Sequence, residues 1–85
     1  MERFPARLRV VSPDGAPISR VLVTIESTSI PIPELALRPN CDGEIEVMLP
    51  RGTFTIRAFR PDGTLHELAC EVTGTGAETF EIMLR

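Results

Sequence analysis

The segment Asp42–Ala58, which reads DGEIEVMLPRGTFTIRA, decides the fold of this chain. On each side of the Pro-Arg-Gly turn, every second residue is apolar; these are Ile45, Val47 and Leu49, then Phe54, Ile56 and Ala58. A period of two is typical of a strand with one buried and one solvated side. The segment therefore predicts two strands, Glu44–Leu49 and Thr53–Arg60, joined as a hairpin.

The same alternation continues on both sides of this segment. Further runs are found at Ala6–Val11, Arg20–Ser27, Leu65–Val72 and Glu78–Leu84. Three Asp-Gly pairs mark turns, because an Asp side chain can cap a turn and Gly accepts a positive φ. Prolines interrupt residues 28–40, where we expect a loop or irregular edge segment with a short edge strand at Leu35–Arg38. The sequence predicts an all-β chain, a seven-stranded antiparallel β-sandwich forming a single domain over residues 1–85.

Composition excludes several classes of function. The chain has 85 residues and a net charge of -3, whereas a nucleic-acid groove needs a dense basic stripe. No apolar run approaches the ~20 residues of a membrane helix, so we expect no membrane insertion. The N-terminus has no signal-peptide pattern. We therefore expect a cytoplasmic protein if the chain is complete, and a secreted or envelope protein if it is an excised domain.

Two residue types leave alternatives open. All nine basic residues are Arg, which fits either a coding bias or selection for bidentate contacts to carboxylates at an interface. Cys41 and Cys70 lack metal-site spacing. Cys70 shares its strand face with Leu68 and Val72, which favours a buried small hydrophobe. A disulfide between the two cysteines would need a Cα separation below about 7 Å.

The sequence offers no recognisable catalytic group. His66 is the single His, and no nucleophile motif accompanies it. Glu67 and Glu71 would lie about 13 Å apart on a strand, too far for a glycosidase pair. The Asp-Gly aspartates, Asp14, Asp42 and Asp62, lack the spacing of a calcium loop, and no phosphate-binding Gly-rich loop is present. We expect no enzymatic activity, no cofactor and no metal.

Four pieces of the chain carry a family resemblance, and they are Asp14–Ile18, Val21–Ile25, Asp42–Val47 and Leu49–Ala58. In this order, between about Leu8 and Leu84, the chain resembles the carboxypeptidase regulatory-like domain. The resemblance implies a transthyretin-like (prealbumin-like) Greek-key sandwich of seven strands, and says little about activity. The isopeptide bond of similar pilus sandwiches needs a Lys, and the related hydroxyisourate hydrolases need several His and a Tyr. This chain has neither Lys nor Tyr.

The resemblance also implies a role. Relatives of this fold occur as docking pieces, so we expect a non-catalytic protein-interaction or adaptor domain with a protein partner. It would be an accessory or docking module of a larger assembly, such as a contractile injection (secretion) system. The alternative is a structural or carbohydrate- or peptide-binding module of an envelope or secreted protein. The absence of Trp and Tyr weighs against a sugar-stacking platform.

Candidate partner-binding residues come from two features. The first is the apolar, proline-rich segment with Ile30, Ile32, Leu35 and Leu37, because exposed apolar patches often mark contact sites. The alternative interpretation of this segment is a loop that folds over one end of the sandwich and caps the core. The second feature is that Met48, Phe59 and Met83 fall at outward-facing positions, where they would make one sheet face adhesive if they cluster. A free edge strand offers another route to a partner.

Overall fold

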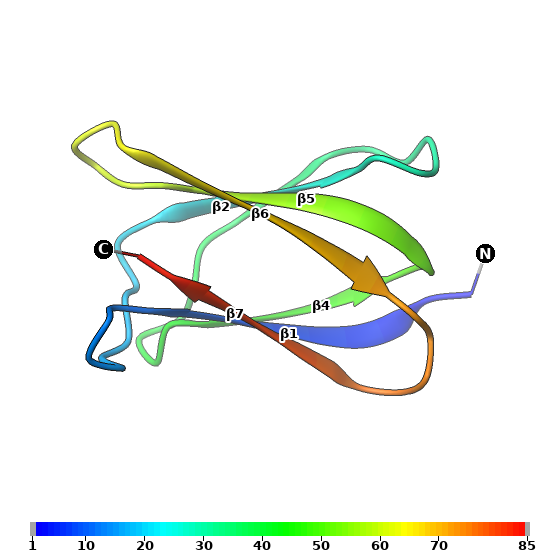
Figure 1. Ribbon diagram of the computed structural model, residues 1–85, viewed down its shortest axis with the longest axis horizontal. Helices are drawn as coiled ribbons and strands as arrows, with labels where there is room; N and C mark the ends of the chain where they lie inside the picture. The colour runs from blue at the N-terminus through cyan, green and yellow to red at the C-terminus, as the bar shows by residue number, and fades with distance from the viewer. Residues whose placement is uncertain (1, 85) are drawn as a thin grey trace.

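Seven strands form the computed structural model, which describes residues 2–84 (Figure 1). Their bounds are β1 Phe4–Val11, β2 Leu22–Ser27, β3 Leu35–Leu37, β4 Glu44–Leu49, β5 Gly52–Phe59, β6 Leu65–Val72 and β7 Glu78–Met83. The predicted number of strands is confirmed, and the bounds of β4 and β6 are the predicted ones. Within the described residues no helix is long and apolar enough to cross a membrane.

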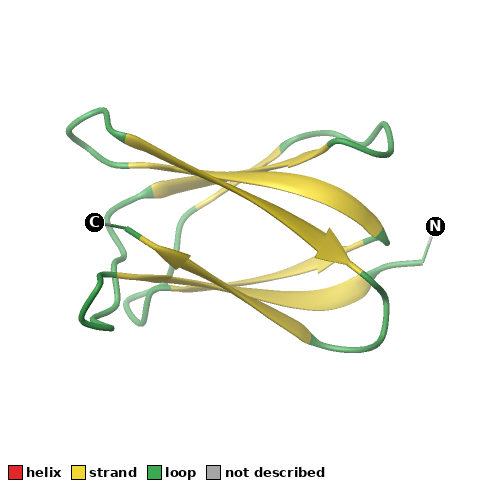
Figure 2. Cartoon of the chain, viewed as in Figure 1, coloured by secondary structure: helices red, strands yellow, loops and turns green. Residues whose placement is uncertain are grey.

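The strands form two facing sheets. Sheet A has the order β4-β1-β7, and sheet B has the order β3-β2-β5-β6. In Figure 1, β2, β5 and β6 lie in the upper layer and β1, β4 and β7 in the lower one. Figure 2 shows that the loops gather at the two ends of this two-layer body, whose extents are 35 × 23 × 17 Å. The sandwich-like, all-β architecture is therefore as predicted.

One predicted feature, an entirely antiparallel arrangement, is wrong. β1 pairs with β7 in parallel, with Leu8 opposite Phe80 and Val10 opposite Ile82. A parallel pair cannot be closed by a tight turn and needs a long crossover connection. Here the connection is the whole chain between the first and last strands, so no turn signal in the sequence specifies the direction of this pair.

The predicted hairpin between β4 and β5 is also wrong. β4 pairs with β1 in sheet A, whereas β5 pairs with β2 and β6 in sheet B. Pro50, which is fully buried, lies where the chain passes from one sheet to the other. Because Pro has no N–H to donate, it does not continue a hairpin ladder. The apolar sides of β4 and β5 therefore face each other across the core instead of lying side by side.

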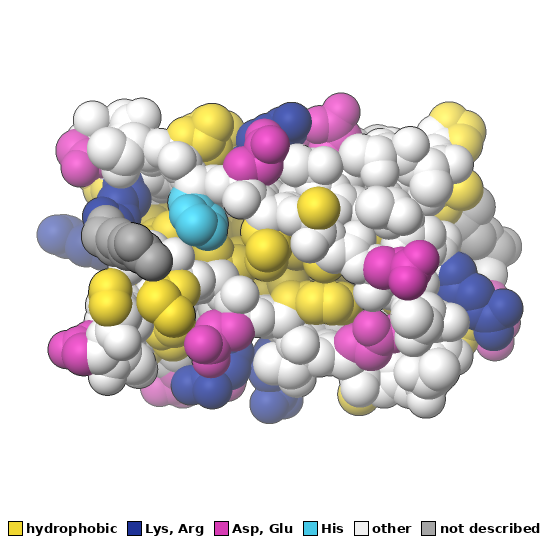
Figure 3. Space-filling model, in the orientation of Figure 1, with side chains coloured by type: hydrophobic (Ala, Val, Ile, Leu, Met, Phe, Trp, Pro, Cys, Tyr) yellow, Lys and Arg dark blue, Asp and Glu magenta, His cyan; other side chains and the backbone are white. Residues whose placement is uncertain are grey.

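The alternating residues form the core between the sheets. Both layers contribute buried side chains, among them Leu8, Val10, Val23, Ile25, Leu49, Phe54, Ile56, Val72 and Ile82. Leu68 and Cys70, for which the sequence favoured an inward face, are only partly buried, as is Phe80. They lie on β6 and β7, which are edge strands of the two sheets. Figure 3 shows hydrophobic side chains gathered along this side of the molecule, between β6 and β7.

The three Asp-Gly turns share one geometry. In the turns that begin at Ser12, Asn40 and Arg60, the Gly N–H three residues on donates to the carbonyl of the first residue. The N–H of the first residue donates to the carbonyl four residues on. This pattern fits a three-residue loop made of a type I turn followed by a Gly at positive φ. The glycines have φ of 87°, 73° and 89°, as the sequence predicted.

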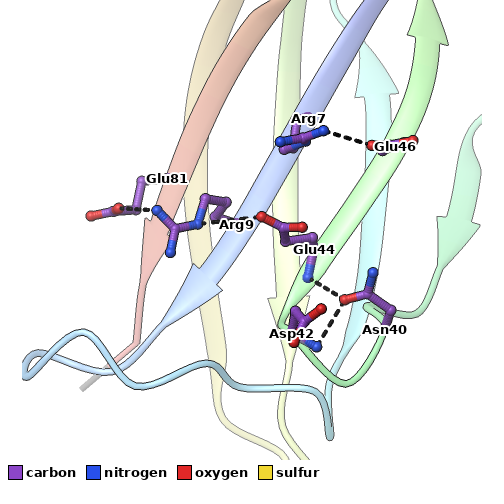
Figure 4. Close-up of polar contacts among 7 residues, drawn as sticks. All are labelled: Arg7, Arg9, Asn40, Asp42, Glu44, Glu46 and Glu81. Carbon is purple, nitrogen blue, oxygen red and sulfur yellow. Dashed lines mark hydrogen bonds and ion pairs between the residues drawn. The ribbon is translucent and has the colours of Figure 1, made fainter.

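Side chains cap these turns in two ways. The Asp14 carboxylate accepts from the Ala16 N–H, and the Asp62 carboxylate from the N–H and hydroxyl of Thr64. The hydrogen bonds from Ser12 to Asp14 and from Thr64 to Asp62 are the main reason why the pKa of each carboxyl is below its ordinary value. In the remaining turn the capping group is Asn40, whose amide oxygen accepts the N–H groups of the two residues that Figure 4 shows beside it, Asp42 and Glu44.

Candidate functional site

The proline-rich segment lies against one edge of the core. β3 pairs with β2 at the edge of sheet B, and the side chains of Ile32, Leu35 and Leu37 pack on the buried cluster. Ile30 is half-buried, and its N–H donates to the Ser27 hydroxyl over 3.0 Å. The segment thus covers the core, as its alternative interpretation expected. Its role as a partner-binding segment stays a prediction.

The three outward-facing candidates are exposed but do not form one patch. Met48 lies opposite Pro5, and Met83 opposite Val11, so both lie on sheet A. The two positions on β1 are six residues apart, about 20 Å along a strand. Phe59 lies on sheet B. The clustering that would have made one sheet face adhesive is absent, because register and sheet membership separate these three residues.

A contiguous apolar row does cross the outer face of sheet B. Phe59 on β5 is opposite Leu22 on β2 and Leu65 on β6. Directly opposed residues share a face and have Cβ atoms ~4.5–5.5 Å apart. Phe59 is 37% exposed and Leu65 52% exposed, while Leu22 is half-buried. We call Leu22, Phe59 and Leu65 the outer row.

A shallow hollow with three arginines on its rim adjoins the outer row. Its volume is about 330 Å³, and its lining includes Leu22, Phe59 and Pro61 together with Arg20, Arg38 and Arg60. The arginines come from three separate connections, since Arg20 precedes β2, Arg38 follows β3 and Arg60 follows β5. We call this feature the Arg-rimmed hollow.

The outer face of sheet A is mostly occupied by ion pairs, which Figure 4 shows. Arg7 lies 2.8 Å from Glu46, and Arg9 lies 3.7 Å from Glu44 and 4.0 Å from Glu81. A groove of about 530 Å³ crosses this face near Met48 and includes the Arg7–Glu46 pair in its wall. This groove is larger than the Arg-rimmed hollow, but its arginine is already paired with Glu46, and its other charged group, Glu78, accepts hydrogen bonds from Thr73 and Gly74.

Ion pairs also occupy the middle of the outer face of sheet B. Arg57 lies 2.7 Å from both Glu26 and Glu67, and 4.0 Å from Glu34. Cross-strand Glu–Arg pairs therefore join β5 to β2 and β6 on sheet B, and β1 to β4 and β7 on sheet A. On sheet B the outer row lies beyond these charges, at the end where β5 finishes.

The remaining candidate groups do not converge on one site. His66 is exposed and borders a small hollow with Ala58 and Leu84 at the end of the sandwich. Cys41 is exposed, Cys70 is half-buried, and neither forms a disulfide. Among residues 2–84, no three His, Cys, Asp or Glu side chains are grouped so that they could hold a metal ion.

The two cysteines should differ in reactivity. Burial, with a smaller contribution from the charge of Glu78, raises the pKa of the Cys70 thiol to about 11 from an ordinary 9.0. Such a shift leaves about 100-fold less of the reactive thiolate near neutral pH. We expect iodoacetamide to label Cys41 in the folded protein while Cys70 stays largely unmodified, as measured by peptide mass spectrometry. Both cysteines should react in concentrated guanidinium chloride. Equal labelling rates in the folded protein would contradict the burial of Cys70.

Comparison with known proteins adds no family assignment. A scan against protein-family models and a search of curated proteins each found no match to this chain. The resemblance to the carboxypeptidase regulatory-like domain therefore stays a prediction.

Sequence reasoning did not identify Leu22 and Leu65 as surface candidates. A signal was present, because each falls at an outward position of its alternating strand. Only the register of β2, β5 and β6 places them on either side of Phe59.

Proposed function

We propose that this chain is a non-catalytic protein-interaction domain that docks a partner protein on the outer row. The observation that carries the proposal is the alignment of Leu22, Phe59 and Leu65 across three neighbouring strands on a solvent-facing side. Contiguous exposed apolar surface on a small domain is typical of an interaction site.

The energetics favour an occupant for this surface. Burying apolar area contributes roughly 25 cal/mol per Å² of binding free energy. A partner that covered these three adjacent apolar side chains would therefore be bound more tightly. Interface cores are enriched in aromatic residues, and interfaces as a whole in Arg. The outer row with its neighbouring arginines has this composition.

Other surfaces are weaker candidates. The larger groove on sheet A has one large apolar side chain, Met48, and a matched Arg7–Glu46 ion pair. The two leucines of β3, Leu35 and Leu37, already pack on the core. The edge of β6 has an outward Glu67 and Glu71, and charged side chains discourage edge pairing.

The finer fold assignment is part of the same proposal. We propose a transthyretin-like Greek-key sandwich that acts as an accessory or docking module of a larger assembly, such as a contractile injection system. Support comes from the motifs that resemble the carboxypeptidase regulatory-like domain and from seven strands divided into sheets of three and four. The proposed partner surface does not depend on this assignment.

A pull-down tests the proposal. The tagged chain would be incubated with lysate of its own source, washed at moderate salt and analysed by quantitative mass spectrometry. We expect one stoichiometric partner with the wild-type chain and loss of that partner with the double variant Phe59→Ser and Leu65→Ser. The matched control is Met48→Ser with Met83→Ser, which removes two exposed apolar side chains from sheet A and should retain the partner.

Thermal unfolding has to accompany the pull-down. Because Phe59 and Leu65 are exposed and contribute two cross-strand pairs, Phe59 with Leu22 and Phe59 with Leu65, their double variant should lose only about 1–2 kcal/mol of stability. A folded outer-row variant that still captures the partner would refute the assigned surface. A wild-type chain that captures nothing would refute the interaction function itself.

A further inference from the structure

We infer that the partner binds through an acidic segment that carries an apolar side chain. In this arrangement the apolar side chain lies on Leu22 and Phe59, and flanking carboxylates meet Arg20 and Arg38. The inference rests on the proposed docking function and adds the chemistry of the partner. It is carried by the placement of unmatched positive charge at the rim of an apolar hollow.

Arg20 and Arg38 differ in their contacts from most other arginines of residues 2–84. Arg3 donates a hydrogen bond to the Met48 carbonyl oxygen over 3.4 Å. Arg7, Arg9 and Arg57 each face carboxylates, and Arg51 lies over the Phe4 ring, 5.3 Å from its centroid. By contrast, within residues 2–84 neither Arg20 nor Arg38 forms an ion pair, and both are exposed. Their charge is therefore available to a partner.

The fold brings these charges together from distant parts of the chain. Leu37 is opposite Val23 in the β2–β3 pair, so the next residue, Arg38, comes beside Leu22. Arg20 and Arg60 line the same hollow. Arg60 contributes to lowering the pKa of Asp62, so part of its charge is matched within the chain. A local excess of positive charge remains in a protein whose net charge is -3.

The geometry suits a peptide segment. A volume of about 330 Å³ is at the low end of ligand pockets, and the hollow is open and shallow, so it fits one apolar side chain. Arg is suited to bind carboxylates, because its planar guanidinium donates two parallel hydrogen bonds to the two oxygens. An apolar anchor flanked by Asp or Glu would therefore satisfy both features of the site.

Charge complementarity favours an acidic segment over two other possible occupants, a second copy of this chain and a nucleic acid. A second copy that used the same surface would bring arginines against arginines, and like charges at an interface are unfavourable. A nucleic acid would also meet the arginines, but its long phosphate backbone would extend onto carboxylates such as Glu26 and Glu67 on the same sheet face.

The test is a selection followed by affinity measurement. A library of short random peptides displayed on phage would be selected on the 85-residue chain, and an enriched peptide would be synthesised with a fluorescent label. We expect the enriched peptides to share a large apolar residue with two or more Asp or Glu nearby. Binding should weaken at least about tenfold in the double variant Arg20→Gln and Arg38→Gln, and also when salt rises from about 0.05 to 0.5 M.

A matched control removes equal charge elsewhere. Arg3→Gln with Arg51→Gln changes the net charge by the same amount, and Arg51 lies at the opposite end of β5 from Arg60. This control should bind the peptide normally. Both double variants alter exposed side chains, so their thermal midpoints should stay close to that of the wild type, with a small loss in the control from the Arg51–Phe4 contact.

The outcomes separate the two claims. Enriched peptides without acidic residues, or binding that survives the loss of Arg20 and Arg38, would overturn the inference. If that binding still required Phe59 and Leu65, the docking function would stand. Tighter binding of a single-stranded oligonucleotide than of the acidic peptide would also overturn the inference. Failure to enrich any peptide, while the pull-down still captures a partner that requires Phe59 and Leu65, would overturn the inference and leave the docking function standing.

Discussion

Replacing Phe54 by Ala is expected to destabilise the protein by about 3–5 kcal/mol. Phe54 is fully buried and is the bulkiest of the fully buried side chains. Its removal takes apolar area out of the core and leaves a cavity that two facing sheets cannot readily close. A domain of 85 residues has a total stability of roughly 4–13 kcal/mol, so the variant should lose a large fraction of that stability.

Urea unfolding followed by circular dichroism measures this effect. The matched control is Ile56→Val, which removes a single methyl group from the same face of β5 and should cost about 0.5–1.5 kcal/mol. If Phe54→Ala cost no more than Ile56→Val, the core would not be packed around Phe54, and the two-layer arrangement would be contradicted.

Replacing Gly43 by Ala is expected to cost roughly 2–4 kcal/mol, although it adds only one methyl group. Gly43 has φ of +73°, and an added Cβ would lie 2.6 Å from the Val10 carbonyl oxygen and 3.1 Å from the Ile18 nitrogen. Those two groups are hydrogen-bonded to each other over 2.8 Å. The methyl group would thus press on backbone atoms that are fixed between β1 and the segment before β2.

A second glycine separates this clash from backbone strain. Gly63 ends an equivalent turn with φ of +89°, but an added Cβ would meet nothing within 4 Å. Gly63→Ala should therefore cost only about 1 kcal/mol, from the positive φ alone. The difference between the two variants, measured by thermal or urea unfolding, reports the contact of Gly43 with β1. Equal costs would mean that this close approach does not exist.

Features specified by local sequence were predictable. Alternation placed Val23, Ile25, Phe54 and Ile56 in the core, because the two-residue period of a strand assigns each side chain to a face without knowledge of its neighbours. The turns were predictable for a similar reason, since an Asp-Gly dipeptide favours a turn with Gly at positive φ whatever its neighbours are.

Features set by pairing between distant segments were not predictable. The turn at Pro50 could join neighbours in one sheet or lead to the other sheet, and its length suits both. The direction of β7 relative to β1 depends on the entire intervening chain. The candidate site depends on such pairing as well, because Leu22, Phe59 and Leu65 become neighbours only through the register of three strands.

The most direct test of the proposed docking surface is site-specific photo-crosslinking in the cells of origin. A photoreactive phenylalanine analogue would replace Phe59 or Leu65 in turn, with Met48 and Met83 as control positions of similar exposure on sheet A. If the outer row is the docking surface, we expect a crosslinked partner of one mass from positions 59 and 65 and none from the control positions. Crosslinks confined to Met48 or Met83, or of equal yield at all four positions, would contradict it.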